Sequence, residues 1–295
     1  EVPNITPEET LASSPVSKDI EFYSMANFPN RTVEELQEVL DTVDENFPKE
    51  IDGKPTGAQI LMIKNVTILL PSKNHEDVIF ENFNSLYQFC SKNIENYEIL
   101  VVSNGSDLKN IKILDVYKGN KNVNHEVLSS SGKGLAVKHG LEKAKYNNIL
   151  IYDADFSYKI EMFLNFFDSN DEPIAPFMYL ERTLSKEILK NTSLLRVVGG
   201  VTFNFLVRKI LKIKSKDTQA GFKFVNKKEF KSCLDFHSKD FDYDLELFLL
   251  ANKSKIKTHS VKVFEIIESD YTNVGIISDS IKMFIKLFNL RDNYL

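Results

Sequence analysis

Apolar and polar positions follow a regular alternation of elements from about residue 65 onward. Short continuous apolar runs, typical of buried parallel strands, alternate with longer stretches of helical period. Strands are predicted at residues 66–70, 97–102, 122–128, 149–152 and 172–178, and helices at 78–90, about 134–144 and 242–252. Strands that alternate with helices imply right-handed crossovers between parallel strands. The pattern predicts an α/β fold with a Rossmann-like, mostly parallel sheet flanked by helices.

Residues 1–57 have a different pattern. Proline residues interrupt them, and one helix is predicted near 33–43, where Thr32 and Glu35 form a capping box ahead of an apolar stripe. Residues 52–57 are typical of a linker. We expect an acidic N-terminal extension over 1–57, partly helical or disordered, and an α/β domain over 58–295.

Charge reinforces this division. Residues 1–57 hold 13 Asp/Glu and 4 Lys/Arg, which is −9, while the whole chain carries −5, so residues 58–295 carry +4. This mild excess gives no support for nucleic-acid binding, and no recognition motif is present. It is compatible with anionic phosphate ligands and an anionic membrane surface.

Cysteine and histidine usage argues against structural metal or disulfides. Cys90 and Cys233 are far apart and have no metal-binding spacing, and the five histidines are scattered. Two reduced core cysteines indicate a cytosolic protein.

The most informative polar positions follow the predicted strand 149–152, where Asp153 and Asp155 stand one residue apart. Ligands of open α/β sheets bind at the ends of such strands. Paired carboxylates repel unless a cation lies beside them, and hard oxygen ligands suit Mg²⁺ or Mn²⁺ with phosphate oxygens. The alternative is a turn in which the aspartates cap a following helix.

A second candidate is Gly132-Lys133-Gly134, which opens a predicted helix. It lacks the spacing of a Walker P-loop. A flexible turn with a lysine at a helix N-terminus suits an anion, and the alternative is a plain turn.

Two amphipathic segments, residues 193–214 and 274–291, are rich in apolar side chains and carry mainly basic charges. Both suit an interfacial position on a membrane. For 193–214 the alternative is a buried helix hairpin.

Two further segments combine charged and apolar residues. Residues 216–223 mix charged, small and aromatic side chains, as ligand loops do. Asp242 and Asp244 either cap the helix at 242–252 or face a ligand. Glu246 sits in an apolar stretch and needs a partner, for which Lys223 is a candidate.

Together these motifs resemble one family. Leu70-Pro-Ser-Lys-Asn74, Ser103-Asn-Gly-Ser106, Gly132-Lys-Gly134, Asp153-Ala-Asp155, Asp217-Thr-Gln-Ala-Gly-Phe-Lys223 and Asp244-Leu-Glu246 occur in this order. The chain, over about residues 64–292, resembles the inverting family-2 glycosyltransferases. Within them it is most similar to the dolichyl-phosphate glucosyltransferase branch of polyprenyl-phosphate glycosyltransferases, followed by the dolichyl-phosphate mannose synthases.

The resemblance implies a GT-A fold with amphipathic C-terminal helices and a set of site roles. The candidate catalytic carboxylates are Asp155, Asp217, Asp244 and Glu246. The metal, Mg²⁺ or Mn²⁺, is expected at Asp155 with Asp153 and Ser157 beside it. The donor nucleotide sugar is expected at Pro71, Asn74, Asn104, Lys133 and Asp153, and acceptor phosphate at Arg196 and Lys223.

Two positions depart from the family pattern. Asn104 stands where the family has an aspartate that accepts a hydrogen bond from the base, and Ser157 stands where mannose synthases have a glutamine. These departures leave the base and the third metal ligand open.

The implied reaction is inverting transfer of a hexose from a UDP- or GDP-sugar to a polyprenyl phosphate, by an enzyme on the cytoplasmic face of a membrane. One alternative is a transferase with a glycan hydroxyl acceptor, in which Asp217, Asp244 or Glu246 is the base. The other is a degenerate, non-catalytic binding module. The sugar and the oligomeric state stay open.

Overall fold

The computed structural model describes residues 50–51, 54–55, 62–183, 194–264, 267 and 286–294. The chain divides into two compact units, Glu1–Gln59 and Ile60–Leu295. In the first unit, β1 (Glu50–Ile51) pairs antiparallel with β2 (Lys54–Pro55). The helix expected near residues 33–43 lies outside the described residues, and the domain boundary at 57/58 stays a prediction.

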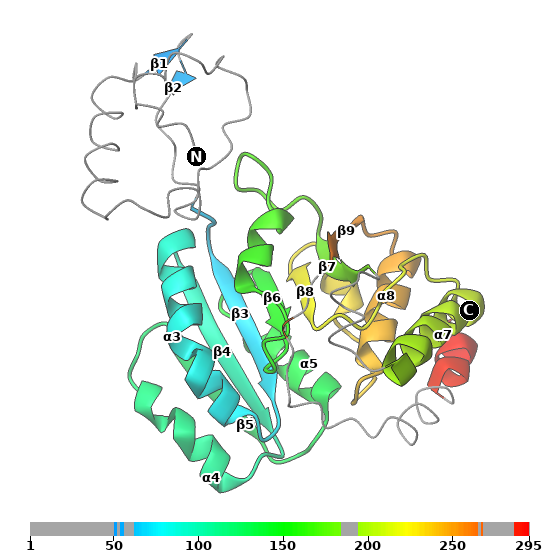
Figure 1. Ribbon diagram of the computed structural model, residues 1–295, viewed down its shortest axis with the longest axis horizontal. Helices are drawn as coiled ribbons and strands as arrows, with labels where there is room; N and C mark the ends of the chain where they lie inside the picture. Colours follow the sequence, from blue (N-terminus) through cyan, green and yellow to red (C-terminus); the bar gives the residue numbers. More distant parts are fainter. Residues whose placement is uncertain are drawn as a thin grey trace, which may run out of the picture. The chain divides into compact units, whose positions relative to one another are not determined.

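The second unit is built on a seven-stranded sheet in the order β5-β4-β3-β6-β8-β7-β9 (Figure 1). Its strands are β3 (Val66–Ser72), β4 (Tyr97–Asn104), β5 (Val123–Leu128), β6 (Asn148–Tyr152), β7 (Phe177–Arg182), β8 (Phe222–Asn226) and β9 (Thr258–Val263). All neighbouring pairs are parallel except those of β8, which runs antiparallel to both β6 and β7. The predicted mostly parallel sheet is therefore confirmed.

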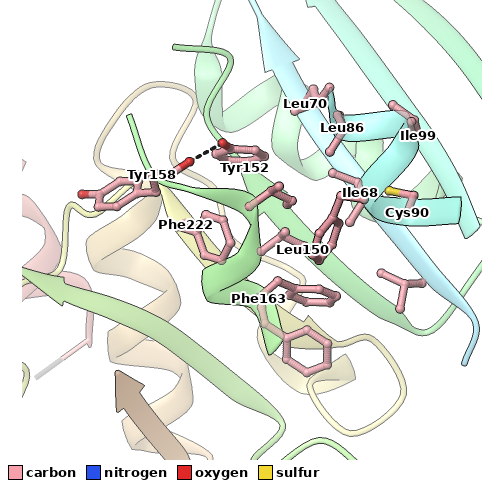
Figure 2. Packing of buried hydrophobic residues seen from close by; sticks show 14 of the residues in the cluster. Ile68, Leu70, Leu86, Cys90, Ile99, Leu150, Tyr152, Tyr158, Phe163 and Phe222 are labelled. Carbon is pink, nitrogen blue, oxygen red and sulfur yellow. Dashed lines mark hydrogen bonds between the residues drawn. The ribbon is translucent and has the colours of Figure 1, made fainter. Parts of the chain in front are cut away.

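Alternation of side chains along the strands supplies a core on each face of the sheet. Ile68 and Leu70 of β3 point to one face and Leu69 to the other, and all three are fully buried. The first face packs on α3 (Glu76–Asn93), where Leu86 and Cys90 lie against Ile68 and its neighbours (Figure 2). The other face packs on α5 (Lys133–Lys143), α7 (Leu194–Leu211) and α8 (Tyr243–Lys253).

Short elements complete the fold. They are α4 (Leu108–Ile111) and the 3₁₀ turns Lys112–Tyr117, Ile160–Phe166 and Lys231–Cys233. Phe163 and Phe166 from the second of these turns are buried on the α3 face of the sheet. Both cysteines are buried free thiols, as the sequence predicts.

Predicted and observed elements agree closely up to β6 and less well beyond it. β7 was expected at 172–178 but spans Phe177–Arg182, so that prediction is wrong for most of its length. Pro173 and Pro176 lack an amide hydrogen and cannot donate to a ladder, which moves the strand past them. β8 and β9 were not predicted. Both are short, and their polar residues interrupt the apolar run that marks a buried strand.

The two amphipathic segments form helices where they are described. Residues 194–211 make one continuous helix, α7, so the alternative of a helix hairpin is excluded for this range. Residues 274–285 lie outside the described residues, and 286–294 form a helix whose Leu287 and Leu290 are buried against the α8 side of the sheet. Figure 1 shows this C-terminal helix, in red, beside α7. No helix in the described ranges has the length and apolar character needed to cross a bilayer.

Candidate functional site

Four polar segments meet at one edge of the sheet. The parallel strands β3, β4 and β6 end there, which places Ser72–Asn74, Asn104–Ser106 and Asp153–Ser157 at a common edge. Because β8 runs in the opposite direction, it begins at this same edge, directly after the segment 217–221. The sheet therefore brings together the motifs that the sequence analysis singled out.

Asp153 is held from three sides. Its Oδ2 lies 2.6 Å from Lys133 Nζ, and its backbone N–H donates to Gly221 O at 2.9 Å. A Cβ on Gly221 would lie 2.2 Å from Asp153 Oδ2, so only glycine leaves room for this carboxylate. Asp153 Oδ1 is buried and has no hydrogen-bond partner in the part of the chain that the structure describes. A buried unpaired acceptor is costly, which indicates that a ligand completes this group.

Asp155 occupies a turn that orients it toward the same region. Its Oδ1 accepts from the Ser157 N–H at 3.0 Å, a local turn that the left-handed backbone of Phe156, with φ of 51°, accommodates. Burial, and next the charge of Asp153, raise the pKa of Asp155 above its ordinary value. The Asp-x-Asp motif therefore forms a local turn, and the role of its aspartates as metal ligands stays a prediction.

The chemistry of this pair fits a divalent cation. Two nearby carboxylates are favoured in their charged forms when a cation lies beside them. Within the described residues no group of three or more His, Cys, Asp or Glu side chains could hold an ion. Two carboxylates, with water and phosphate oxygens in the other positions, are the usual set for Mg²⁺ at phosphate-binding sites. Ser157 hydrogen-bonds Asp155 through both its amide and its side chain, and its role as a third ligand stays a prediction.

Lys133 lies within a tightly packed turn. Burial opposes its charge, but Asp153 and Asp244 hold its pKa above the ordinary lysine value. Its Nζ also lies 5.4 Å from the centre of the Phe241 ring. The turn packs against segment 237–241, because the Leu135 N–H donates to Lys239 O at 3.1 Å, and a Cβ on Gly134 would lie 2.3 Å from Ser238 O. The glycines of this motif therefore permit close backbone packing beside Lys133.

The residues predicted to line the base pocket have hydrogen bonds within the fold. Asn104 is buried, donates to Ser72 O at 2.6 Å and accepts from the Gly132 N–H at 2.9 Å. Asn74 Oδ1 accepts from the Asp107 N–H and from Asn110 Nδ2. An aspartate at 104 could accept from Gly132 but could not donate to Ser72, which is a physical reason for asparagine here. Direct contact of Asn104, Asn74 or Pro71 with a base stays a prediction.

Asp217 is paired with Arg182, which the sequence analysis did not identify. Arg182 Nε lies 2.6 Å from Asp217 Oδ2 and Nη2 lies 2.9 Å from Oδ1, a bidentate contact. Burial alone would raise the pKa of Asp217, but the Arg182 charge and its hydrogen bonds hold it below the ordinary value. The Arg182 side chain is 39% exposed, whereas that of Asp217 is 3% exposed. Arg182 is the last residue of β7 and lies beyond the predicted strand 172–178, and a partner 35 positions later gives no local signal in the sequence.

The Asp244 and Glu246 side chains have different partners from those expected. Lys223 Nζ lies 2.9 Å from Asp244 Oδ1, so the expected pair between Lys223 and Glu246 is wrong. Glu246 instead accepts from the N–H groups of His237 and Ser238, at 2.8 and 2.7 Å, and from the Tyr294 hydroxyl. Spacing alone could not distinguish the two acids, because both are buried on α8.

The structure describes the two predicted acceptor-binding residues, Arg196 and Lys223, to different extents. Arg196 lies in α7, and its side chain is outside the described part. Lys223 is 1% exposed and committed to Asp244 and to Ala220 O. Its predicted role in binding phosphate stays a prediction, and Arg182 is the more accessible cation at this edge.

A pocket of about 350 Å³ lies beside Asp155, between α3 and the 3₁₀ turn Ile160–Phe166. Its wall includes Glu81, Asn82 and Tyr152. The Tyr152 hydroxyl donates to Tyr158 O beneath the Asp155 turn (Figure 2). The buried aromatic cluster thereby supports the turn that carries the carboxylates.

The chain is similar in sequence to proteins of known function. The chain is 25% identical to human dolichyl-phosphate beta-glucosyltransferase over 216 residues, 68% of this chain and 67% of that one. It is 27% identical to a dolichyl-phosphate beta-glucosyltransferase of Trichomonas vaginalis over 277 residues, 84% of this chain and 77% of that one. The match to the Drosophila melanogaster relative spans 66% of its length, slightly less than two thirds.

Solved structures share the fold. Glucosyl-3-phosphoglycerate synthase of Mycobacterium tuberculosis, in complex with phosphoglyceric acid, superposes with a TM-score of 0.59 at 12% identity, covering 77% of this chain and 80% of that one. The same enzyme with Mn²⁺, UDP and glucosyl-3-phosphoglycerate gives a TM-score of 0.58. Mannosyl-3-phosphoglycerate synthase of Rubrobacter xylanophilus gives 0.56 at 15% identity, covering 77% and 73%. The predicted GT-A fold is confirmed.

The profile of glycosyl transferase family 2 matches residues 67–231, from the first strand of the sheet to the segment after β8. This range contains the Asp153–Asp155 pair, Lys133 and the 217–223 segment. The predicted resemblance and enzyme class are confirmed, and the chain belongs to glycosyl transferase family 2.

Proposed function

We propose that this protein transfers a hexose, with inversion, from a nucleotide diphosphate sugar to a polyprenyl phosphate. The named relatives are dolichyl-phosphate beta-glucosyltransferases, which favours glucose as the sugar and dolichyl phosphate as the acceptor. A structurally similar enzyme is in complex with UDP-glucose, so UDP-glucose is the preferred donor. The cofactor is a divalent metal, Mg²⁺ or Mn²⁺.

One observation carries the choice of a phosphate acceptor. The three carboxylates considered as general bases are all engaged within the fold: Asp217 with Arg182, Asp244 with Lys223, and Glu246 with two backbone amides and Tyr294. A sugar hydroxyl needs a base to remove its proton during attack. A phosphate monoester is already largely ionised near neutral pH and needs none. This site therefore suits an acceptor that arrives charged.

The donor side of the reaction depends on Lys133, Asp153 and Asp155. Asp153 and Asp155 would hold the metal, which supplies charge stabilisation to the departing diphosphate. Lys133 neutralises Asp153 and keeps it oriented, and Gly221 leaves the space in which this carboxylate lies. Catalysis at such a site rests on positioning and on electrostatic stabilisation.

Among the described side chains, Arg182 is the cation best placed for the acceptor phosphate. Two of its N–H groups are used by Asp217, and its side chain is 39% exposed at the sheet edge. Arginine presents five N–H donors, so donors remain for a phosphate. Asp217 would then fix the guanidinium in place for the acceptor.

The described part of α7 supports a peripheral position on the cytoplasmic face of a membrane. Val207 and Leu211 are fully buried, whereas Val201 and Phe205 are 51% and 50% exposed. Arg208 and Lys209 follow Phe205 at helical spacing, which places basic groups beside exposed apolar ones. An exposed face of this kind suits an anionic lipid surface, where a lipid acceptor also resides.

The decisive experiment is a transfer assay with UDP-glucose and GDP-mannose, Mg²⁺ or Mn²⁺, and dolichyl phosphate. We expect a glucosyl lipid product of inverted anomeric configuration with UDP-glucose and a metal. Arg182→Lys should raise the KM for dolichyl phosphate and leave that for UDP-glucose unchanged, with Lys228→Met, at an exposed lysine after β8, as the control.

Other outcomes would select the alternatives. Product on a glycan hydroxyl, with a bell-shaped rate profile centred near neutrality, would favour the hydroxyl acceptor. Failure to bind UDP or Mn²⁺ in calorimetry would favour a non-catalytic binding module.

Membrane association has its own test. Binding to vesicles that contain anionic lipid should weaken when Arg208 and Lys209 are replaced by glutamine, with Lys228 and Lys231 replaced as the control pair. Equal binding to neutral and anionic vesicles would contradict an electrostatic contribution.

A further inference from the structure

Glu246 is a buried acid that accepts hydrogen bonds from groups of the fold. It is 1% exposed, and both of its oxygens accept hydrogen bonds. The donors are the backbone N–H groups of His237 and Ser238, which begin segment 237–241. A carboxylate that accepts charge-assisted bonds from two successive amides fixes the backbone between them.

Segment 237–241 packs directly on the turn that carries Lys133. Lys239 O accepts from the Leu135 N–H, one of the amides at the N-terminus of α5. Ser238 O and Lys239 O lie so close to Gly134 and Gly132 that a Cβ on either would be 2.3 or 2.5 Å away. Phe241 places its ring 5.4 Å from Lys133 Nζ. A shift of this segment would therefore displace Lys133.

Lys133 in turn contacts Asp153 at 2.6 Å. A continuous chain of contacts thus runs from Glu246, through the backbone of residues 237–239, to the Lys133 turn and to Asp153. Every link is a hydrogen bond, an ion pair or backbone packing.

The C-terminal helix at residues 286–294 reaches the same segment. The Tyr294 hydroxyl donates to Glu246 Oε1, and Lys286 Nζ contacts Asp240 Oδ2 at 3.1 Å and also Asp242 Oδ1. Leu287 and Leu290 anchor the helix in the core. Lys286 therefore attaches this helix to segment 237–241, and Tyr294 attaches it to Glu246, which holds that segment.

We propose that Glu246 is a positioning residue, which fixes segment 237–241 against the Gly132–Gly134 turn so that Lys133 stays on Asp153, and that Tyr294 completes this support from the C-terminal helix. The role goes beyond the proposed transfer reaction, because it assigns the late Asp-x-Glu motif to the donor side and excludes it as the base. It also makes the C-terminal helix part of the donor site.

The test compares Glu246→Gln with Glu98→Gln. Glu98 is a matched control, because it is also buried and accepts from the Lys145 N–H, Thr67 and Asn124, away from the site. We expect the rate of amide hydrogen exchange at Leu135, which does not touch Glu246, to rise at least tenfold in Glu246→Gln. The rate at Leu135 should stay unchanged in Glu98→Gln, and the rates in α3 should stay unchanged in both variants. Tyr294→Phe should raise the exchange rate at Leu135 by a smaller factor. Its control is Tyr97→Phe, which loses a hydroxyl contact to Ser91.

Kinetics separate positioning from proton transfer. The kinetic part rests on the proposed function, whereas the exchange measurement does not. We expect Glu246→Gln to raise the KM for UDP-glucose more than it lowers kcat, and to leave the pH profile unchanged. Unchanged exchange at Leu135, or an equal rise in Glu98→Gln, would overturn the proposal even if transfer occurs. Loss of kcat by more than a hundredfold at constant KM would overturn it in favour of a base.

Discussion

Lys223 of β8 and Asp244 of α8 form an ion pair at 2.9 Å with side chains 1% and 6% exposed. Removing one partner from a buried pair leaves an uncompensated charge. We therefore expect Lys223→Met to lower the free energy of unfolding by about 3–5 kcal/mol. Chemical denaturation followed by circular dichroism measures this, and Lys228→Met, at an exposed lysine, serves as the control. A loss below about 1 kcal/mol, typical of exposed pairs, would show that the pair is not buried in solution.

The pair of Asp217 with Arg182 predicts how activity and stability respond to pH. The pKa of folded Asp217 lies below its unfolded value, so its stabilisation is fully present above the unfolded value and is lost as pH falls through the folded one. Asp217 stays ionised and paired across the neutral range. We therefore expect that no ascending limb near neutrality in the pH–rate profile of the wild type depends on Asp217. Asp217→Asn should leave the shape of this profile near neutrality unchanged. A neutral limb that disappears in this variant would identify Asp217 as a base.

The pKa of Asp155 is shifted in the opposite direction from that of Asp217, which should make metal binding sensitive to acid. Burial and Asp153 raise its pKa, so the metal-binding carboxylate form is lost at a higher pH than for an ordinary aspartate. Mn²⁺ affinity measured by calorimetry should therefore fall on acidification, and at a higher pH than for a site built on an ordinary aspartate. An affinity that stays constant as the pH is lowered to the ordinary aspartate pKa would contradict the role of Asp155 as a ligand.

Replacement of Asp155 separates function from stability. Asp155→Asn should lower transfer by roughly 10²-fold or more, because a ligand to the charge-stabilising metal is lost. The melting temperature of the metal-free protein should not fall, because the folded state no longer holds an unfavourable charge. Glu161→Gln, at an exposed acid on the neighbouring pocket wall, is the matched control. Full activity of Asp155→Asn with metal present would rule the ligand role out.

Gly221 tests the placement of Asp153. An alanine Cβ at 221 would lie 2.2 Å from Asp153 Oδ2, so the carboxylate must move. Displacement of a catalytic group by about 1 Å can lower the rate roughly 10²-fold, which is the loss we expect for Gly221→Ala. Gly199→Ala on α7 is the control, because no atom lies within 4 Å of its added Cβ. Its unfolding free energy should rise by up to about 1 kcal/mol. Equal effects of the two changes would show that Asp153 is not confined by β8.

The sequence predicted those parts of the fold that local patterns determine. β3, β4 and β6 were placed to within two residues because each is an apolar run bounded by polar or glycine residues. β5 was placed equally closely although its central residues, Asn124, His125 and Glu126, are polar. β8 was missed because Lys223 interrupts its apolar character, and only the partner on α8 explains a buried lysine in that strand. A strand that depends on a distant partner has no local signature.

The positions of the candidate residues in the fold were predicted better than their contacts, and their roles in the site stay predictions. The motif order placed Asp153, Asp155 and Lys133 at one edge, because strands of a parallel sheet end together. The sequence could not predict which side chains form ion pairs, because Arg182 and Asp217 meet only when β7 and β8 lie side by side. The hydrogen bond from the Tyr294 hydroxyl to Glu246 likewise joins residues that are 48 positions apart in the chain.

The antiparallel direction of β8 affects where substitutions are tolerated in this chain. β7 ends at Arg182, and the chain returns to the same edge at Asp217 before it enters β8. The contact between these two residues joins the two ends of the intervening segment, which carries α7, at the sheet edge. Substitutions in this segment should therefore be tolerated at exposed positions of α7 such as Val201 and Phe205, whereas Val207 and Leu211 are constrained by the core that they share with the sheet.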